Sequence, residues 1–204
     1  MNRTIAALAL ALAAVALPAH AQLAWLDRYD EREDSGIFSR ANQKRIDNVA
    51  IAGVVGLALV EGTDTRLGRT AWQALDAALV TAAATESMKR AFTRPRPAEE
   101  PDAGVWFAGG RHRSFPSGEV AMMAAFTTPF IIAYKDEKPA VWALAALPVY
   151  MAKARMASQG HWLSDVLAGG AIGAGVGYLA ARRDVPLVLA VTGRTAFVGL
   201  RYRF

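Results

Sequence analysis

Apolar residues recur at helical spacing between Asp34 and Arg183, and Gly, Pro and charged clusters interrupt them. Pro129 and Pro148 fall inside two of the apolar stretches, where a proline kinks or breaks a helix. Residues 93–118 are rich in Pro and Gly, which predicts a loop. The pattern predicts an all-α helical bundle with helices over residues 43–60, 66–92, 119–134, 139–156 and 162–182.

Three glycines in the last predicted helix, Gly169, Gly173 and Gly177, recur every four residues. Residues four apart are neighbours on the surface of a helix, so the three glycines share one face. A smooth ridge of this kind lets another helix approach closely. The predicted role of these glycines is therefore helix packing.

The pattern changes after Pro186. Residues 187–191 form a short apolar run, residues 192–195 are typical of a turn, and residues 197–204 alternate between the two faces of a strand. This predicts a short C-terminal β-hairpin over residues 186–204, packed against the helical body. The alternative is a structural envelope protein whose hairpin pairs with the sheet edge of a partner.

The first 21 residues have the order of a secretory signal: a positive charge at Arg3, an apolar run over residues 5–17, and small residues before Ala21. The apolar run has 13 residues, short of the roughly 17–25 that a membrane-spanning helix needs. We therefore predict cleavage after Ala21 and export to the periplasm. The predicted domains are a signal peptide (1–21), a helical domain (22–185) and the hairpin (186–204).

Four further stretches without charged residues lie within the predicted helices. They cover residues 48–60, 120–134, 139–152 and 166–181, and none is longer than 16 residues. These lengths fall short of a comfortable bilayer span, so they favour core helices of a soluble protein or of one associated with a membrane surface. Short membrane helices are the alternative, since their charged ends can lie in the interface.

Charge and cysteine content narrow the function. Without residues 1–21 the chain keeps 22 of its 23 basic residues and all 18 acidic ones, a net charge of +4. This balance suits an anionic small substrate or a lipid surface. No run of Lys or Arg alternates with aromatic residues, so we predict no nucleic-acid partner. The chain has no cysteine, which excludes disulfides and thiolate metal sites.

Three polar clusters interrupt the apolar chain. The first joins Lys89 at a helix end with Arg96 in a proline-containing loop, where cations can converge on an oxyanion. The second places Ser117 and Gly118 where this loop enters a helix, whose unpaired backbone N–H groups can hold a phosphate. Each cluster also has a structural interpretation, the first as a solvated helix end and the second as a helix cap.

The third cluster is Arg155, His161 and Asp165. A four-residue step places Asp165 one helical turn from His161, where the carboxylate can orient the imidazole. The other ring nitrogen is then free to attack phosphorus, while Arg155 neutralises charge on the equatorial oxygens. Taken alone, a histidine at this spacing is more often structural.

Together the clusters read Lys89-x6-Arg96-Pro97, then Pro116-Ser117-Gly118, then Arg155-x5-His161-x3-Asp165. In this order and spacing the chain resembles the type 2 phosphatidic acid phosphatase and vanadium haloperoxidase superfamily, an all-helical fold. The resemblance implies that His161 becomes a phosphohistidine and that Asp165 orients it. It also implies that Lys89, Arg96, Ser117, Gly118 and Arg155 bind phosphate.

The phosphatase branch that this chain resembles acts without a metal or other cofactor on phosphorylated small molecules or lipids. The resemblance therefore implies hydrolysis of a phosphate monoester or diphosphate. The haloperoxidase branch instead binds vanadate at the equivalent histidine. We rank that activity last, because the chain without its signal leaves little room for additional elements around a bound vanadate.

Two positions depart from the family pattern. The family usually has His directly after Pro-Ser-Gly as the general acid, and this chain has Glu119. Glu119 can take that catalytic role only if its pKa is raised towards neutrality, since an ionised carboxylate repels phosphate. His112 is a weaker substitute because charged residues flank it, and Ala154 replaces a frequent Ser. If Glu119 fails as an acid, the alternative is a non-catalytic phosphate-binding protein.

Overall fold

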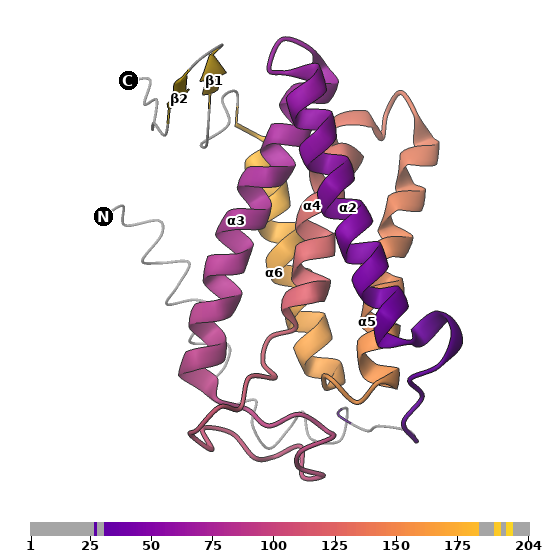
Figure 1. Cartoon of the computed structure of the whole chain (residues 1–204), viewed down its shortest axis with the longest axis vertical. Helices are drawn as coiled ribbons and strands as arrows, with labels where there is room; N and C mark the ends of the chain where they lie inside the picture. The colour runs from indigo at the N-terminus through magenta and orange to yellow at the C-terminus, as the bar shows by residue number, and fades with distance from the viewer. Residues whose placement is uncertain (1–26, 28–30, 184–189, 193–194, 198–204) are drawn as a thin grey trace.

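The computed structural model describes residue 27 and residues 31–183, 190–192 and 195–197. The long helices pack lengthwise into one bundle (Figure 1), so the all-α prediction is confirmed for residues 31–183. In chain order the helices are η1 (Gly36–Phe38), α2 (Arg40–Glu61), α3 (Arg66–Phe92), α4 (Gly118–Tyr134), η2 (Pro139–Ala145), α5 (Ala146–Ala157) and α6 (Leu163–Ala181).

The predicted helix over residues 139–156 is wrong in one respect, because it is divided into η2 and α5, which meet between Ala145 and Ala146. Pro148 explains the division. A proline has no N–H donor and is tolerated in the first turn of an α-helix, so α5 begins just before it. Pro129, in contrast, is accommodated inside α4.

The most extensive contact between two helices is that of α6 with α4. Helix α4 lies at the centre of the bundle (Figure 1). A Cβ atom at Gly169 would overlap the carbonyl oxygen of Ser117, and one at Gly173 would overlap that of Ala121. Gly177 meets side chains of α4 in the same way. The predicted packing role of the three glycines is confirmed, because only hydrogen fits between the two backbones.

Small residues also line the buried face of α3. Ala71, Ala74, Ala77 and Ala78 are buried, and their three- and four-residue spacing places them on one side of the helix. Phe126 of α4 packs against Ala74 and Ala78. The small alanine side chains therefore let α3 lie close beside α4.

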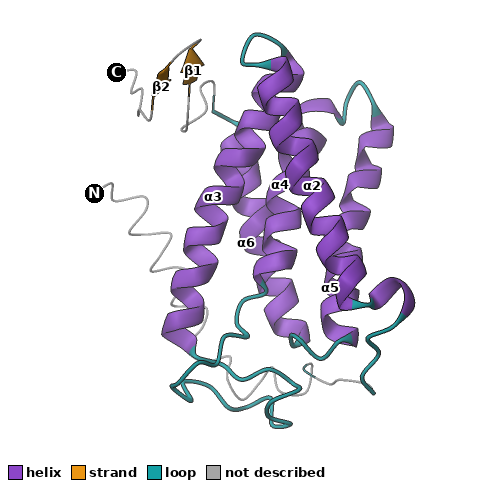
Figure 2. Cartoon of the chain, in the orientation of Figure 1, coloured by secondary structure: helices purple, strands orange, loops and turns teal. Residues whose placement is uncertain are grey.

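Residues 93–117 form the long loop that the prolines and glycines predict (Figure 2). The loop covers the end of the bundle where α4 and α6 begin. Within it the ring of Trp106 lies 5.1 Å from that of Phe115 and 5.9 Å from that of Phe92. The guanidinium of Arg94 stacks over Trp106 at 4.1 Å. These contacts give the loop a small core of its own, in which Trp106 is held.

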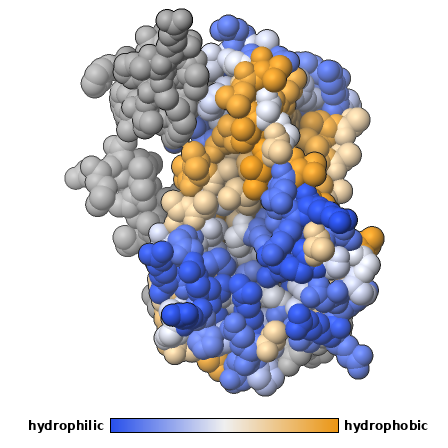
Figure 3. Space-filling model, in the orientation of Figure 1, coloured by the Kyte–Doolittle hydropathy of each residue, from blue (hydrophilic) through white to orange (hydrophobic). Residues whose placement is uncertain are grey.

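The face of the bundle drawn in Figure 3 has two unlike halves. Apolar residues gather over the half away from the loop, and hydrophilic residues cover the half that carries it (Figure 3). The exposed apolar residues include Leu59 and Val60 of α2 and Trp142 of η2. Among the described helices α6 is long and apolar enough to cross a membrane, but a buried core helix meets the same criterion. The length of α6 alone therefore assigns no membrane span.

Two predicted segments fall largely outside the described residues. The predicted signal peptide, residues 1–21, lies wholly outside them. Of the predicted hairpin, the described parts are β1 (Ala190–Thr192) and β2 (Thr195–Phe197), which pair antiparallel with Val191 opposite Ala196. The signal peptide, the domain limits and the hairpin as a whole stay predictions.

Candidate active site

His161 and Asp165 lie at the start of α6, His161 just before the helix and Asp165 in its first turn. The Nδ1 atom of His161 is 3.5 Å from Oδ2 of Asp165, and both side chains are buried. Nε2 is therefore the ring nitrogen available to a substrate. Burial lowers the pKa of His161 to about 4, and the nearby Asp165 carboxylate offsets this only in part. His161 is accordingly neutral at pH 7.

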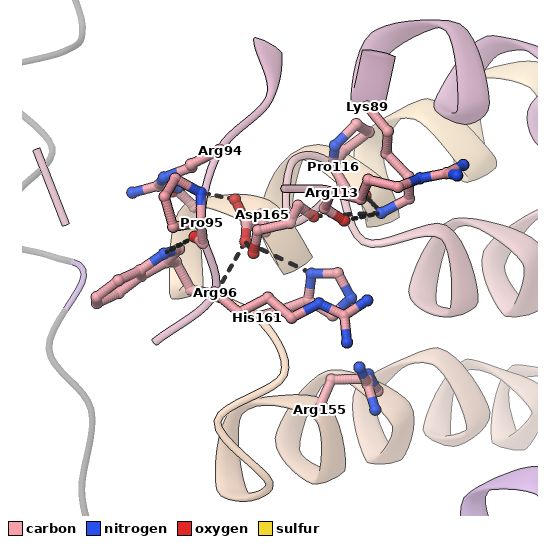
Figure 4. Close-up of polar contacts among 12 residues, drawn as sticks. Lys89, Arg94, Pro95, Arg96, Arg113, Pro116, Arg155, His161 and Asp165 are labelled. Carbon is pink, nitrogen blue, oxygen red and sulfur yellow. Dashed lines mark hydrogen bonds and ion pairs between the residues drawn. The ribbon is translucent and has the colours of Figure 1, made fainter. Parts of the chain in front are cut away.

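Asp165 accepts hydrogen bonds from several sides (Figure 4). Nη1 of Arg94 donates to Oδ1 at 2.8 Å, and the backbone N–H of Trp162 donates to Oδ2 at 3.0 Å. The hydroxyl of Ser114 also donates to Oδ2. Burial raises the pKa of Asp165, but contacts with His161, Arg94 and Ser114 outweigh this and hold the pKa below its usual range. Asp165 is thus ionised and firmly positioned.

Arg94 extends this network to the first described residue. Its Nη2 donates to Oδ2 of Asp27 at 2.7 Å and to the carbonyl oxygen of Ala103 at 2.8 Å. Asp27 also accepts from the backbone N–H and the hydroxyl of Ser164, at 2.8 and 2.7 Å. Asp27 therefore caps the N-terminus of α6, beside the histidine.

Lys89 anchors the loop that leads into α4. Its ammonium group donates to the carbonyl oxygens of Arg113, Ser114 and Pro116, at 2.9, 3.3 and 2.6 Å. Burial lowers the pKa of Lys89 to about 8, because the ammonium group loses hydration. An ammonium group has three donors, and the loop takes all of them. Lys89 therefore offers an anion its charge rather than a spare N–H.

Arg155 approaches His161 from the end of α5. Its Nε is 2.8 Å from Oε2 of Glu119, and its Nη1 donates to Oε1 of Gln43 at 3.1 Å. The guanidinium lies so close to the backbone that a Cβ at Gly160 would overlap it. Burial lowers the pKa of Arg155 to about 10, which still leaves the side chain charged at neutral pH.

Glu119 is paired with two arginines. Nη1 of Arg40 donates to Oε2 of Glu119 at 2.8 Å, Nη2 of Arg40 donates to Oε1, and Arg155 contacts Oε2. Burial raises the pKa of Glu119, but the hydrogen bond from Arg40 and the charge of Arg155 outweigh it, so the pKa lies below its usual value. A general acid at this position requires a raised pKa. The surroundings of Glu119 act in the opposite direction.

A cavity of about 500 Å³ connects these groups. Six of the residues singled out from the sequence line it: Lys89, Arg96, Gly118, Glu119, Arg155 and His161. Lys89, Arg96 and Arg155 lie around His161 (Figure 4). Three cations and a neutral histidine thus share one space, which suits a phosphate group.

Ser117 lies behind the cavity wall. It is fully buried, and its backbone N–H donates to the carbonyl oxygen of Asp165 at 2.9 Å. Its hydroxyl makes no cap hydrogen bond at the start of α4 and has no partner among the described residues. The side chain of Ser117 therefore neither caps α4 nor lines the cavity. Its backbone hydrogen bond joins the start of α4 to α6.

A second pocket, of about 240 Å³ and apolar, lies between α2, α4, η2 and the start of α5. Its wall includes Val54, Met123, Phe130 and Leu147. Phe126 lines this pocket and the cavity that holds His161. The apolar pocket therefore adjoins the cationic cavity.

His112 lies apart from both. Its Nδ1 is 3.0 Å from a carboxylate oxygen of Glu99 on the surface of the loop, as its flanking charges predict. Throughout the described part of the chain, no group of three or more His, Cys, Asp or Glu side chains is arranged to hold a metal ion.

Sequence reasoning missed Arg40, Gln43 and Asp47 of α2. Arg40 and Asp47 line the cavity, and Gln43 holds Arg155. The three positions follow three- and four-residue steps and so share one helix face. This polar stripe on a helix with apolar neighbours could have indicated that α2 faces the site. The cap formed by Asp27 had none, since no sequence pattern links it to α6.

The family model described as the PAP2 superfamily matches residues 70–185, more than half of the 204-residue chain. The matched residues run from α3 to just beyond the end of α6 and include every motif around the cavity. No curated protein and no solved structure matches the chain.

Proposed function

The chain belongs to the PAP2 superfamily, whose members are in general phosphatases, and from this premise we propose that it hydrolyses a phosphate monoester or diphosphate attached to an apolar tail. The reaction passes through a phosphohistidine on His161 and uses protein cations in place of a metal. The observation that carries the proposal is a buried, neutral His161 that shares one cavity with Lys89, Arg96 and Arg155.

His161 is the nucleophile and attacks phosphorus through Nε2. With the Nδ1 proton directed at Asp165, a neutral imidazole keeps its lone pair on Nε2. Positive charge develops on the ring as the P–N bond forms, and the ionised carboxylate 3.5 Å away stabilises it. Arg94 keeps this carboxylate in place through its own hydrogen bond at 2.8 Å.

The transferred phosphoryl group spreads negative charge over its equatorial oxygens. Arg96 and Arg155 offer planar sets of donors to these oxygens, and Lys89 adds its charge. Gly118, the first residue of α4, places a helix N-terminus on the cavity wall, where its partial positive charge favours an anion. Glu119 competes with the substrate for Arg155, because it already pairs with this side chain.

The apolar pocket beside Phe126 supports a lipid-like tail on the substrate. A tail bound there would lie next to the cavity that takes the phosphate, since Phe126 lines both spaces. The apolar half of the surface in Figure 3 supports action at a membrane surface. The predicted signal peptide would place that surface in the periplasm.

One observation favours a second function. The general acid of the family is replaced by Glu119, and the two arginines that pair with it keep its pKa low. Without a proton donor, the cavity would bind phosphate and release no product. The chain would then be a phosphate-binding protein built on a phosphatase fold.

Phosphate release from a long-chain alkyl phosphate by the mature protein tests the proposal. We expect turnover by the wild type and by His112→Gln, whose histidine lies outside the cavity, and none by His161→Gln. Quenching with alkaline denaturant during turnover should trap phosphate on the wild type and not on His161→Gln, because a phosphohistidine is stable in base. Vanadate binding without any turnover would favour the phosphate-binding function instead.

A further inference from the structure

We propose that Asp47 is the general acid of this site and protonates the oxygen of the leaving group. The inference rests on the proposed function and adds a catalytic residue that the family motifs do not contain. Among the described residues the site otherwise lacks a proton donor, because Glu119 stands at the position of the usual acid and is paired with Arg40 and Arg155.

Asp47 is placed for this task. It lies on α2 and lines the same cavity as His161 and the phosphate-binding cations. Gln43, one helical turn before it, holds Arg155, which shows that this face of α2 is directed at the site. Asp47 can therefore reach a substrate whose phosphate lies between Arg155 and His161.

The carboxyl group of Asp47 is also available. Its Oδ1 atom is buried and has no hydrogen-bond partner within the described residues. A buried oxygen without a partner is unusual, because it loses its contacts with water and gains nothing in return. Such burial costs a charged carboxylate more than a neutral carboxyl, so it favours the protonated form of Asp47.

The charges around Asp47 favour its protonated form. Burial raises the pKa of Asp47 to about 6, the negative charge of Glu119 adds to the rise, and Arg40 and Arg155 offset part of it. Glu119 keeps a lowered pKa in the same cavity. Two carboxyl groups whose surroundings push their pKa values apart are the usual sign of separate roles. Tyr150 of α5 also lies close enough to interact with the charge of Asp47. The other ionisable groups that line the cavity are Glu86, Lys89, Arg96 and His161.

The proposed step balances as follows. Nε2 of His161 bonds to phosphorus while the bond from phosphorus to the leaving oxygen breaks, and that oxygen takes the proton of Asp47 to become an alcohol. A water molecule then attacks the phosphohistidine through its oxygen, and the Asp47 carboxylate accepts a proton from this water. The P–N bond breaks, phosphate leaves, and Asp47 is protonated again.

The experiment compares two esters with different needs for an acid. An alkyl phosphate has a poor leaving group, whereas the nitrophenolate of 4-nitrophenyl phosphate leaves without protonation. For Asp47→Asn we expect kcat/KM, which reports the transfer of phosphate to His161, to fall by about 10²–10⁴-fold on octyl phosphate, the usual contribution of a general acid, and by less than about tenfold on the aryl ester. The exposed Asp136→Asn serves as the matched control and should leave both rates unchanged.

The pH dependence gives a second readout. On octyl phosphate the wild type should lose activity above about pH 6, as Asp47 ionises, and Asp47→Asn should lack this limb. Asp47→Glu, which keeps a carboxyl group, should restore part of the rate and the limb. Equal losses on both esters, or an unchanged limb in Asp47→Asn, would overturn the acid role.

Failure of the acid role and failure of the proposed function give different results. His161→Gln should abolish turnover of 4-nitrophenyl phosphate, an ester whose transfer to His161 does not need a proton from Asp47. If this His161-dependent turnover is present and Asp47→Asn matches Asp136→Asn on both esters, the function stands and the acid role is overturned. If no His161-dependent turnover of either ester occurs, both are overturned.

Discussion

The guanidinium of Arg94 and the carboxylate of Asp165 form a buried ion pair, with Nη1 2.8 Å from Oδ1. The same guanidinium binds Asp27, so one side chain connects two acids that are far apart in the sequence. Because Asp165 faces His161, the position of His161 depends on Arg94 as well as on Asp165.

Removal of Arg94 should therefore be costly. Arg94→Ala would leave Asp27 and Asp165 buried without their cation, and we expect the free energy of unfolding to fall by about 3–5 kcal/mol. Urea denaturation followed by circular dichroism measures this loss. The control is Arg90→Ala, which removes an exposed ion pair between Arg90 and Glu86 of α3. This change should cost less than about 1 kcal/mol. Similar small losses in both variants would contradict the structural role of Arg94.

Glu119→Gln should strengthen the binding of anions. The substitution removes a negative charge from the cavity and releases Arg155 from its ion pair, so we expect vanadate to bind about tenfold more tightly, a gain of about 1.4 kcal/mol. Inhibition by vanadate at pH 7, where the low pKa of Glu119 keeps the wild-type side chain ionised, measures the change.

The control for this experiment is Glu137→Gln. Glu137 pairs with Arg66 on the surface and does not line the cavity, so this variant should bind vanadate like the wild type. An affinity that is unchanged in Glu119→Gln would show that Glu119 does not compete for the site.

His161 should make stability fall in acid. The pKa of His161 in the folded protein is about 4, below the ordinary value of 6.5. Between these pH values the histidine is protonated in the unfolded chain and neutral in the folded protein. Stability is therefore lost as the pH falls from about 6.5 to about 4, by on the order of 2 kcal/mol from this group. Urea denaturation at both pH values should show a smaller difference for His161→Gln than for the wild type. Equal differences would contradict the buried neutral state of His161.

The glycines of α6 should differ in their tolerance of a methyl group. In Gly173→Ala the new Cβ would overlap the carbonyl oxygen of Ala121, and we expect a loss of about 1–3 kcal/mol. At Gly175 a Cβ meets nothing within 4 Å. Gly175→Ala should therefore raise stability by up to about 1 kcal/mol, because alanine favours the helix. Thermal unfolding of the two variants compares them directly, and equal shifts would exclude close contact at Gly173.

Local pattern was enough to predict most of the fold. The bounds of α3 agree with the periodicity, because the spacing of apolar residues records which face of a helix is buried. The four-residue spacing of Gly169, Gly173 and Gly177 likewise indicated the contact with α4. The division at Pro148 was harder to foresee, because a proline can kink a helix or begin one.

The chemistry of the site was predicted only in part. Motif spacing singled out His161 and five other residues that line the cavity, but not Arg40 or Asp47. Spacing along the chain does not say which distant side chains will pair, and the contacts of Glu119 with Arg40 therefore came from the packing of α2 against α4. The same limit applies to Asp27, whose partner Arg94 lies 67 positions away.

In the proposed reaction, the ion pair of Glu119 with Arg155 affects the release of phosphate. Inorganic phosphate has no tail to hold it in the apolar pocket. When it leaves, the carboxylate of Glu119 can pair with Arg155 again. Product release should then be fast and product inhibition weak. An enzyme built in this way would keep working in surroundings rich in free phosphate, and it would distinguish substrate from product by the tail rather than by the phosphate they share.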